Sequence, residues 1–374
     1  MKFKHVLFFV FAGLASLLLT SCGPAPMVNW PGMTSDGTNV YLAAGEYVYV
    51  VRASDGQGLT METPEGPLPR RFPARADANL AFYGAPALTP AGQVVVGNAS
   101  TMGNDYLLYS VDPSTATPKW TFLNNQGVWL AGAVTDAETI YAASGDGKVY
   151  AFDFDGKKRW ESIVSDDALW SSPVINDDSI YIATLSHDVI ALDPATGKQR
   201  WKITLDNAII GAPAISEDGM LYVGTLSGNL YAINATEGSQ EWLTTLDGSI
   251  WATPALDGET LYIGTTNGTT GKFYAINTAD GKQARTPIDD TGAIVASPLV
   301  TADQVIYVTE EGFIKFLDKN GAPTANPIKI ENAKIYTTPL LVGDLILVAP
   351  MNAPFALAAY NQQGVQQWTY VAVR

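Results

Sequence analysis

The sequence predicts an all-β fold, a single β-propeller whose repeats favour eight blades of four antiparallel strands. Prolines recur at spacings of 40, 41, 44 and 41 residues, from Pro173 through Pro213, Pro254 and Pro298 to Pro339. Between them lie short runs of Tyr, Val and Ile bounded by Gly, Asp and Asn, which are typical of strands and hairpins. The repeat shows no sustained 3.6-residue period, so we expect few helices. Four short strands in about 40 residues match one propeller blade.

Composition narrows the classes of function. Of the 374 residues, 47% are hydrophobic and 16% are charged, which suits a folded chain with a sizeable core. The 37 acidic residues outnumber the 22 basic ones, and the net charge of −15 disfavours binding to nucleic acid or anionic lipid. One Cys and two His leave no intrachain disulfide, thiolate metal cluster or His-rich metal site.

The N-terminal segment is predicted to be a targeting signal. An uncharged, mostly apolar run from Val6 to Leu19 suits a secretory signal and is short for a membrane span. It leads into Leu-Thr-Ser-Cys, which resembles the bacterial lipobox, whose Cys is lipidated and becomes the mature N-terminus. We expect residues 1–21 to be a lipoprotein signal peptide, Cys22 to carry the lipid, and residues 22–28 to form a short tether. An ordinary secretory signal with a chance Cys is the alternative.

Eight copies of the repeat can be aligned. They begin near Pro31, Pro86, Ala133, Pro173, Pro213, Pro254, Pro298 and Pro339. The first copy is the least regular, so seven blades remain an alternative, and the way the ring closes is open. The last strand, Gln367–Val371, is expected in the final blade beside the N-terminal strands.

Each copy follows one internal plan. A Tyr-containing strand, a polar turn and a second strand ending in Asp or Asn are followed by Gly and, four residues later, by Trp. Gly197 and Trp201 are one such pair, and Arg285 takes the Trp position in another copy. An Asp or Asn before the Gly suits a side chain that bonds its own turn backbone. We expect the Trp to fill the seam between neighbouring units.

These motifs resemble the β-propeller repeats of the quinoprotein (pyrroloquinoline quinone, PQQ) family. The clearest copy, Ala191–Trp201, reads ALDPATGKQRW. The resemblance implies one propeller domain over residues 29–374, and it says little about function, which depends on the site. Many members that are dehydrogenases hold the quinone between a Trp and a vicinal Cys–Cys disulfide, with Ca²⁺ and an Asp base. Because this chain has no Cys pair, we expect neither PQQ nor calcium.

A metal site is not expected elsewhere. Asp153–Gly156 is faintly similar to a calcium loop, but it lacks the third acidic position and the distal Glu. His187 stands in a predicted hairpin, where a turn role is favoured over acid–base chemistry. No catalytic residue is therefore assigned.

Aromatic residues mark a candidate binding site. Tyr83, Trp170, Trp251 and Tyr336 each stand three residues before a repeat Pro, and Trp129 is expected to hold the matching place in the copy without Pro. Since this stretch leads into the innermost strand, the five aromatics are predicted to ring one mouth of the central channel. They would stack on a sugar, a quinone or a peptide side chain. The alternative is packing between blades.

The long connection between Gly56 and Tyr83 is a second candidate. It is rich in Pro, and Arg70, Arg71 and Arg75 cluster there in a chain otherwise poor in positive charge. Long loops on a rigid scaffold often carry contacts, so these arginines are candidate partner residues, with a solvated insertion as the alternative.

The resemblance extends to the lipoproteins of the BamB family, which support outer-membrane assembly through protein contacts. It implies a monomeric, non-enzymatic binding scaffold of the bacterial cell envelope, anchored by lipid on the periplasmic face or the cell surface. Its partners would be envelope proteins, with the β-barrel assembly machinery among them. A small-molecule or glycan receptor using the aromatic mouth, and a quinone-dependent or glycan-acting enzyme, are the alternatives.

Overall fold

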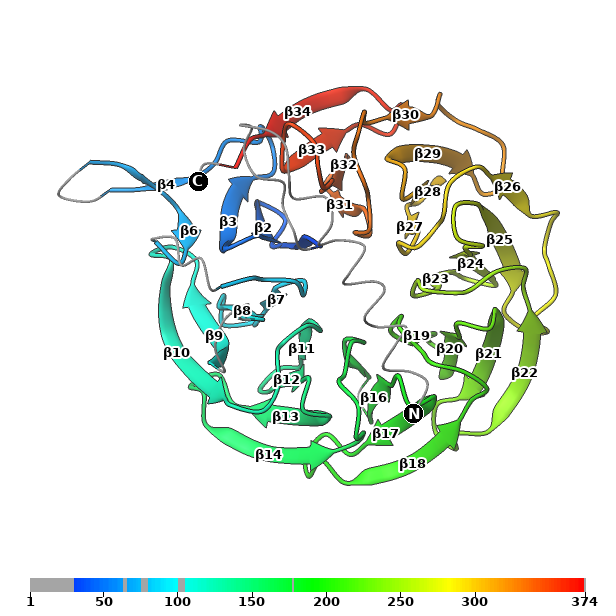
Figure 1. Cartoon of the computed structure of the whole chain (residues 1–374), viewed down its shortest axis with the longest axis horizontal. Coiled ribbons are helices and arrows are strands. Elements are labelled where there is room, and N and C mark those ends of the chain that lie inside the picture. The colour runs from blue at the N-terminus through cyan, green and yellow to red at the C-terminus, as the bar shows by residue number, and fades with distance from the viewer. Residues whose placement is uncertain (1–29, 63–65, 75–79, 100–104, 177, 373–374) are drawn as a thin grey trace.

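The computed structural model describes residues 30–62, 66–74, 80–99, 105–176 and 178–372. Eight four-stranded antiparallel sheets stand around a central axis, with the first strand of each sheet innermost (Figure 1). The all-β, eight-bladed prediction is confirmed, and the seven-bladed alternative is excluded. Among these residues there is no helix with the length and apolarity that crossing a membrane requires.

The blades follow one another along the chain. Blade 1 contains β1 (Gly32–Ser35), β2 (Asn39–Ala44), β3 (Tyr47–Arg52) and β6 (Arg71–Phe72). Blade 2 contains β7 (Ala87–Leu88), β8 (Val94–Gly97), β9 (Tyr106–Asp112) and β10 (Thr117–Asn124). Blade 3 contains β11 (Ala133–Thr135), β12 (Ile140–Ala143), β13 (Lys148–Phe152) and β14 (Lys158–Ile163). Blade 4 contains β15 (Val174–Ile175), β16 (Ile180–Ala183), β17 (Asp188–Leu192) and β18 (Gln199–Thr204).

The second half repeats this order. Blade 5 contains β19 (Ala214–Ile215), β20 (Met220–Gly224), β21 (Asn229–Asn234) and β22 (Gln240–Thr245). Blade 6 contains β23 (Ala255–Asp257), β24 (Thr260–Gly264), β25 (Gly271–Asn277) and β26 (Ile288–Asp290). Blade 7 contains β27 (Leu299–Val300), β28 (Gln304–Val308), β29 (Phe313–Asp318) and β30 (Ile328–Lys329). Blade 8 contains β31 (Leu340–Val342), β32 (Leu345–Val348), β33 (Leu357–Tyr360) and β34 (Gln366–Tyr370).

The hydrophobic core lies between the blades. The two middle strands of each blade are almost wholly buried, and each core cluster joins residues of adjacent blades, as Tyr181 of blade 4 joins Leu221 of blade 5. The Tyr of the second strand is at most 1% exposed in blades 3 to 7: Tyr141, Tyr181, Tyr222, Tyr262 and Tyr307. Each blade is therefore stabilised by its neighbours, and the ring gives every blade two of them.

The repeat Trp fills five of the eight seams, as predicted. The indole Nε1 of Trp160 donates a hydrogen bond to the Pro194 carbonyl of the next blade at 2.9 Å, and Trp201 does the same to Ala235 at 2.9 Å. The same bond recurs from Trp120 to Phe154, from Trp242 to Thr278 and from Trp368 to Ala53. Where Arg285 replaces Trp, its Nη1 donates to the Lys319 carbonyl at 2.7 Å instead.

The ring closes without sharing strands between the chain ends. Blade 1 is wholly N-terminal and blade 8 wholly C-terminal. Trp368 of blade 8 packs on Gly56 of blade 1, and Thr337 Oγ1 donates to the Pro31 carbonyl at 2.7 Å. The predicted C-terminal strand is confirmed one residue earlier, as β34, in the last blade and beside blade 1. Closure thus depends on side-chain contacts.

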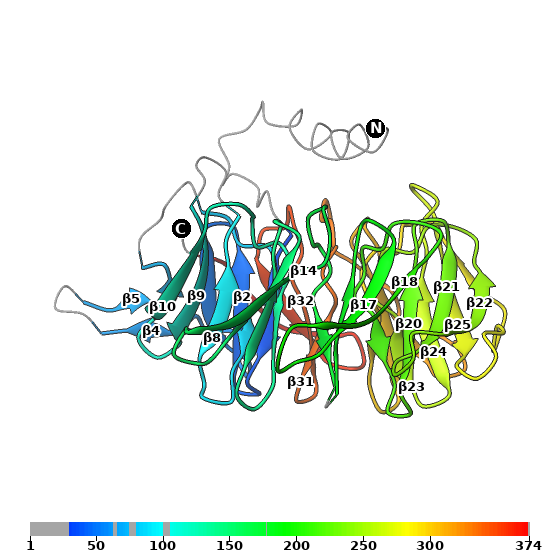
Figure 2. The ribbon, with the colours of Figure 1, turned by 90° about the horizontal axis from the view of Figure 1, so that it is seen from below.

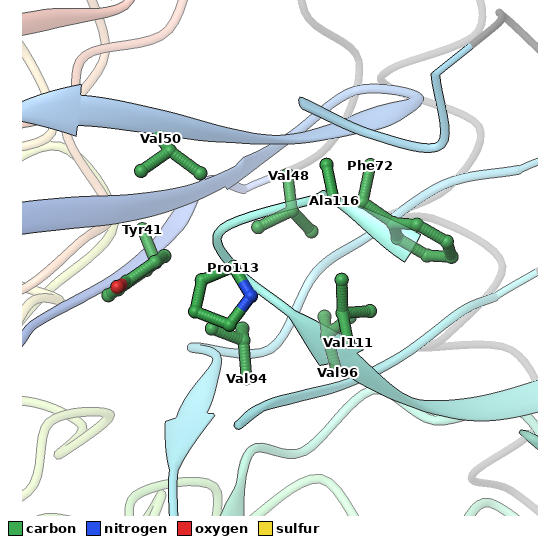
Figure 3. Close-up of a pocket in the computed structure, with 9 residues that line it drawn as sticks. All are labelled: Tyr41, Val48, Val50, Phe72, Val94, Val96, Val111, Pro113 and Ala116. Atoms are coloured by element: carbon green, nitrogen blue, oxygen red, sulfur yellow. The ribbon is translucent and has the colours of Figure 1, made fainter. Parts of the chain in front are cut away.

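The seam between blades 1 and 2 lacks a Trp. A cavity of about 10 Å³ remains there, lined by Tyr41, Val48, Val50, Phe72, Val94, Val96, Val111, Pro113 and Ala116 (Figure 3). This is the space of about one water molecule, and its apolar walls offer few hydrogen-bond partners, so we expect it to stay dry.

An inserted hairpin interrupts the outer strand of blade 1. β4 (Thr60–Met61) and β5 (Leu68–Pro69) pair with each other and project from the rim (Figures 1 and 2). The chain then returns to blade 1, where Arg71 and Phe72 pair with β3 as its outermost strand. We call residues 60–69 the arm.

Candidate functional site

The stretches that precede the innermost strands meet one another around the axis. A Cβ on Gly84 would lie 2.8 Å from the Ala131 carbonyl of the next blade, and one on Gly211 would lie 2.6 Å from the Ala252 carbonyl. Side chains connect other neighbouring stretches: the Ser297 hydroxyl accepts a hydrogen bond from the Thr253 N–H at 2.9 Å. These contacts form a tight collar just ahead of the innermost strands, and the residue three before each repeat Pro belongs to it.

Four of the five predicted aromatics lie at this collar. Tyr83, Trp170, Trp251 and Tyr336 are all half-buried. Their predicted place at one mouth of the central channel and their role in binding stay predictions.

Trp129 is not part of the ring. It is 1% exposed, packs in the core between blades 2 and 3, and donates from Nε1 to the Tyr106 carbonyl at 3.3 Å. The register of blade 3 pairs Val134 with Tyr141, so Ala133 stands in the Pro position and Leu130, three residues earlier, occupies the collar place. The prediction was off by one residue, because Trp129 stands four residues before Ala133, and the aromatics of the other copies stand three before the Pro.

Trp30 takes a collar place that the sequence analysis missed. β1 pairs Thr34 with Tyr41, which puts Met33 in the Pro position and corrects the expected start of this copy at Pro31. The signal was present in the sequence, because Trp30 precedes Tyr41 by the same eleven residues that separate Trp170 from Tyr181.

Within the described collar, a ring stack, a hydrogen bond and an ion pair come together where blades 7, 8 and 1 meet. The rings of Trp30 and Tyr336 stack with centroids 5.3 Å apart at 22°. The Tyr336 hydroxyl donates to Glu310 Oε1 at 2.8 Å, and Lys334 Nζ contacts the same oxygen at 3.0 Å. Burial, with the hydrogen bond to Glu310, raises the pKa of Tyr336 well above its usual value, so the hydroxyl stays neutral. We call Trp30, Tyr336 and Glu310 the aromatic corner.

The arginine candidates lie at the base of the arm. The Arg71 guanidinium lies 4.0 Å from the centre of the Tyr47 ring, and Arg70 Nη2 donates to the Thr60 carbonyl at 3.3 Å. Both side chains are half-buried; the Arg70 bond joins the arm to blade 1, and the Arg71 contact lies within blade 1. Arg75 and the lipidation candidate Cys22 lie outside the described residues.

Turn roles account for two residues weighed above. Asp153 Oδ1 accepts backbone N–H bonds from Asp155 at 3.1 Å and Lys157 at 2.8 Å. His187 has φ +73° in the hairpin that precedes β17. The part of the chain that the structure describes holds no group of three His, Cys, Asp or Glu side chains that could bind a metal ion.

A groove opens at the seam where the ring closes. It measures about 360 Å³ and lies between residues 55–60 with Pro69, at the base of the arm, and Thr369–Val371, at the end of β34. This groove could not be predicted from the sequence, because its walls come from segments near the two ends of the chain.

Comparisons with known proteins support the propeller assignment. The family model described as "Outer membrane protein assembly factor BamB" matches residues 28–187. No curated protein sequence matches the chain significantly. The resemblance to PQQ-type repeat propellers, and to BamB among them, is thus confirmed.

Many solved structures share the fold, and three of them show its range. BamB from Moraxella catarrhalis superposes with a TM-score of 0.64 at 15% identity, covering 90% of this chain and 95% of that one. A europium-containing methanol dehydrogenase gives 0.64 at 13%, covering 89% and 84%. The computationally designed protein Ika8 gives 0.62 at 12%, covering 78% and 87%. At these identities the likeness concerns the fold, which is shared by an assembly factor, a dehydrogenase and a designed protein.

Proposed function

We propose that this chain is a lipid-anchored, non-enzymatic scaffold of the bacterial cell envelope that binds proteins in the manner of BamB. The observation that carries the proposal is the match to BamB over nearly the full length of both chains, together with the family match at residues 28–187. A rigid ring with an inserted arm and a terminal groove presents surfaces for binding, which suits a scaffold.

The anchor belongs to this proposal. Residues 1–21 are the signal peptide, Cys22 carries the lipid, and residues 22–28 tether the propeller, which begins at residue 29. At about 3.3 Å per residue, this tether holds the ring within about 25 Å of the membrane. Replacement of Cys22 by Ser is expected to release the protein from the membrane fraction, with propeller melting unchanged as the control. Retention of the variant would contradict lipid anchoring.

Crosslinking and pull-down of the lipidated protein from its own membranes tests the scaffold. The expected result is recovery of envelope proteins, with components of the β-barrel assembly machinery among them. This chain itself is expected as a monomer, with no crosslink to a second copy. Mass spectrometry identifies the partners, and the Cys22→Ser protein is the control. Absence of any stable partner would overturn the proposal.

A receptor for a glycan or another small molecule is the second candidate, favoured by the aromatic corner. Stacked rings beside a carboxylate suit a neutral or cationic ring that carries hydroxyl donors. Titration of ligands against tryptophan fluorescence tests this function, with Trp30→Phe as the informative variant. Quenching that persists unchanged in Trp30→Phe would place binding elsewhere.

The dehydrogenase alternative requires PQQ and a cation. The residues do not match the quinone site of that family, since the chain has a single Cys and cannot form the vicinal disulfide. We therefore derive no catalytic step through the quinone. A quinone absorption band in purified protein mixed with PQQ and Ca²⁺ would restore this alternative.

A further inference from the structure

The outer strand of blade 8 differs from the others in its chemistry. Every blade ends in an outer strand, and such edges are normally protected from pairing by charged residues, by Pro or by shortness. The other seven outer strands all carry charge, for example Lys158 in β14, Lys202 in β18 and Glu241 in β22. β34 reads Gln-Gln-Trp-Thr-Tyr and carries none.

Some backbone N–H and C=O groups of β34 point away from blade 8. The Tyr370 carbonyl accepts from the Ala356 N–H at 2.8 Å, so it faces the interior of blade 8. In an antiparallel pair alternate residues face opposite ways, so Thr369 turns its N–H and C=O away from β33. Thr369 also lies on the wall of the groove.

The groove beside this edge supplies apolar contacts. Leu59, Tyr370 and Val371 line it, and Val371 is 61% exposed. The arm borders it through Pro69, and Leu68 next to that residue is 41% exposed. An edge that lacks charge thus lies next to a hollow of about 360 Å³ with accessible aliphatic side chains.

We infer that β34 is a docking edge, to which an extended segment of another protein adds as a fifth strand of blade 8. The segment pairs with the outward backbone groups of β34 and places an apolar side chain in the groove, the mode known as β-augmentation. A charged residue opposite β34 is disfavoured, because this strand offers no counter-charge. A second copy of the chain is the less suited occupant, because each copy carries a net charge of −15. This inference rests on the scaffold proposal and names its surface.

A photo-crosslinking residue at Thr369 tests the edge in the lipidated protein in its own membranes. The matched control is Leu243, which also follows the seam Trp of its outer strand, is 43% exposed, and lies on charged β22. Thr369 is expected to capture one contiguous segment of a partner, and Leu243 is not. Equal capture at both positions, no capture at Thr369, or capture of a second copy would each overturn the inference.

The captured segment is then made as a synthetic peptide. On binding, it is expected to slow hydrogen exchange of the Thr369 amide, because that N–H becomes hydrogen-bonded. Thr369→Lys should weaken peptide binding at least about tenfold, while Leu243→Lys leaves it within about twofold and both variants melt like the parent protein. Binding that leaves the Thr369 amide unprotected would contradict strand addition.

The two proposals fail in different ways. If pull-down recovers envelope partners but Thr369 captures none of them, the docking edge fails and the scaffold stands. If Thr369 captures a segment from a protein unrelated to envelope assembly, the edge stands and the BamB-like role fails.

Discussion

Gly197 explains at the scale of one residue why the repeat keeps a glycine before its tryptophan. Its φ is +69°, and a Cβ there would lie 2.5 Å from the Trp160 ring of the preceding blade. Gly197→Ala should therefore lose about 1–2 kcal/mol from the backbone and about 1–3 kcal/mol from overpacking. Gly258 has φ +56° and open space around it, so Gly258→Ala should show the backbone loss alone. Equal losses in denaturant unfolding would contradict this account of the seam.

Arg285 offers the opposite test, because its replacement is expected to increase the stability of the protein. Its Nη2 is buried without a hydrogen-bond partner, although Nη1 reaches the Lys319 carbonyl. Trp is expected to restore the seam bond and to remove the unsatisfied donor, so Arg285→Trp should stabilise the protein by about 1 kcal/mol. Arg285→Ala is the control and should destabilise it. A lower melting temperature for the Trp variant would show that this seam has adapted to arginine.

Residue-scale reasoning from the sequence failed where the repeat loses its markers. Trp129 was given the collar place that Leu130 holds, and the first copy was started at Pro31, two residues before Met33, which holds the Pro position. Spacing to the Tyr of the second strand is a better guide, because cross-strand pairing fixes that register in the sheet. The seam Trp residues were placed correctly, since Gly and Trp keep their spacing within one hairpin.

At the scale of elements, the arm is an addition to blade 1. Thr60 pairs with Pro69 inside the arm, and the strand pairing of blade 1 resumes at Arg70 and Arg71. Replacing residues 61–68 with a two-residue Asn-Gly turn should leave the melting temperature within a few degrees, because the described residues of this segment, 61–62 and 66–68, are not buried.

The same deletion measures what the arm does for binding. The expected result is weaker partner capture in the pull-down, because the arm borders the groove and carries exposed Leu68. A matched control is Leu123→Ser on β10, which removes a similarly exposed leucine from another blade. Unchanged capture by the arm deletion would mean that the insertion is only solvated chain.

The order of strands and turns could largely be predicted from the sequence, and the features that could not be predicted have physical reasons. Hydrophobic runs and Gly turns define the middle strands, because these are buried on both faces. The arm and the groove were not readable, because they depend on contacts between distant segments. A Pro-rich stretch indicates a long connection without indicating that it folds into a hairpin.

At the scale of the whole molecule, the ring has one seam that no peptide bond crosses. Trp368 and Thr337 of blade 8 close it against blade 1. At the seam of Trp160 the chain itself joins blades 3 and 4, which keeps them at high effective concentration if the contact weakens. Replacing Trp160 or Trp368 by Ala should lower the free energy of unfolding by about 3–5 kcal/mol. The loss should be larger for Trp368→Ala, because opening that seam frees both ends of the chain.

Circular permutation separates this topological effect from local packing. Joining the termini through a linker of about six residues is feasible, because other blades cover the same path from seam Trp to collar in nine residues, as from Trp242 to Trp251. New termini at the exposed Asp166 would make the Trp160 seam the unlinked one. The order should then reverse, with Trp160→Ala lowering the melting temperature more than Trp368→Ala does. If Trp368→Ala stays the more damaging change in the permuted ring, its cost arises from local packing, and closure of the ring plays no special part in stability.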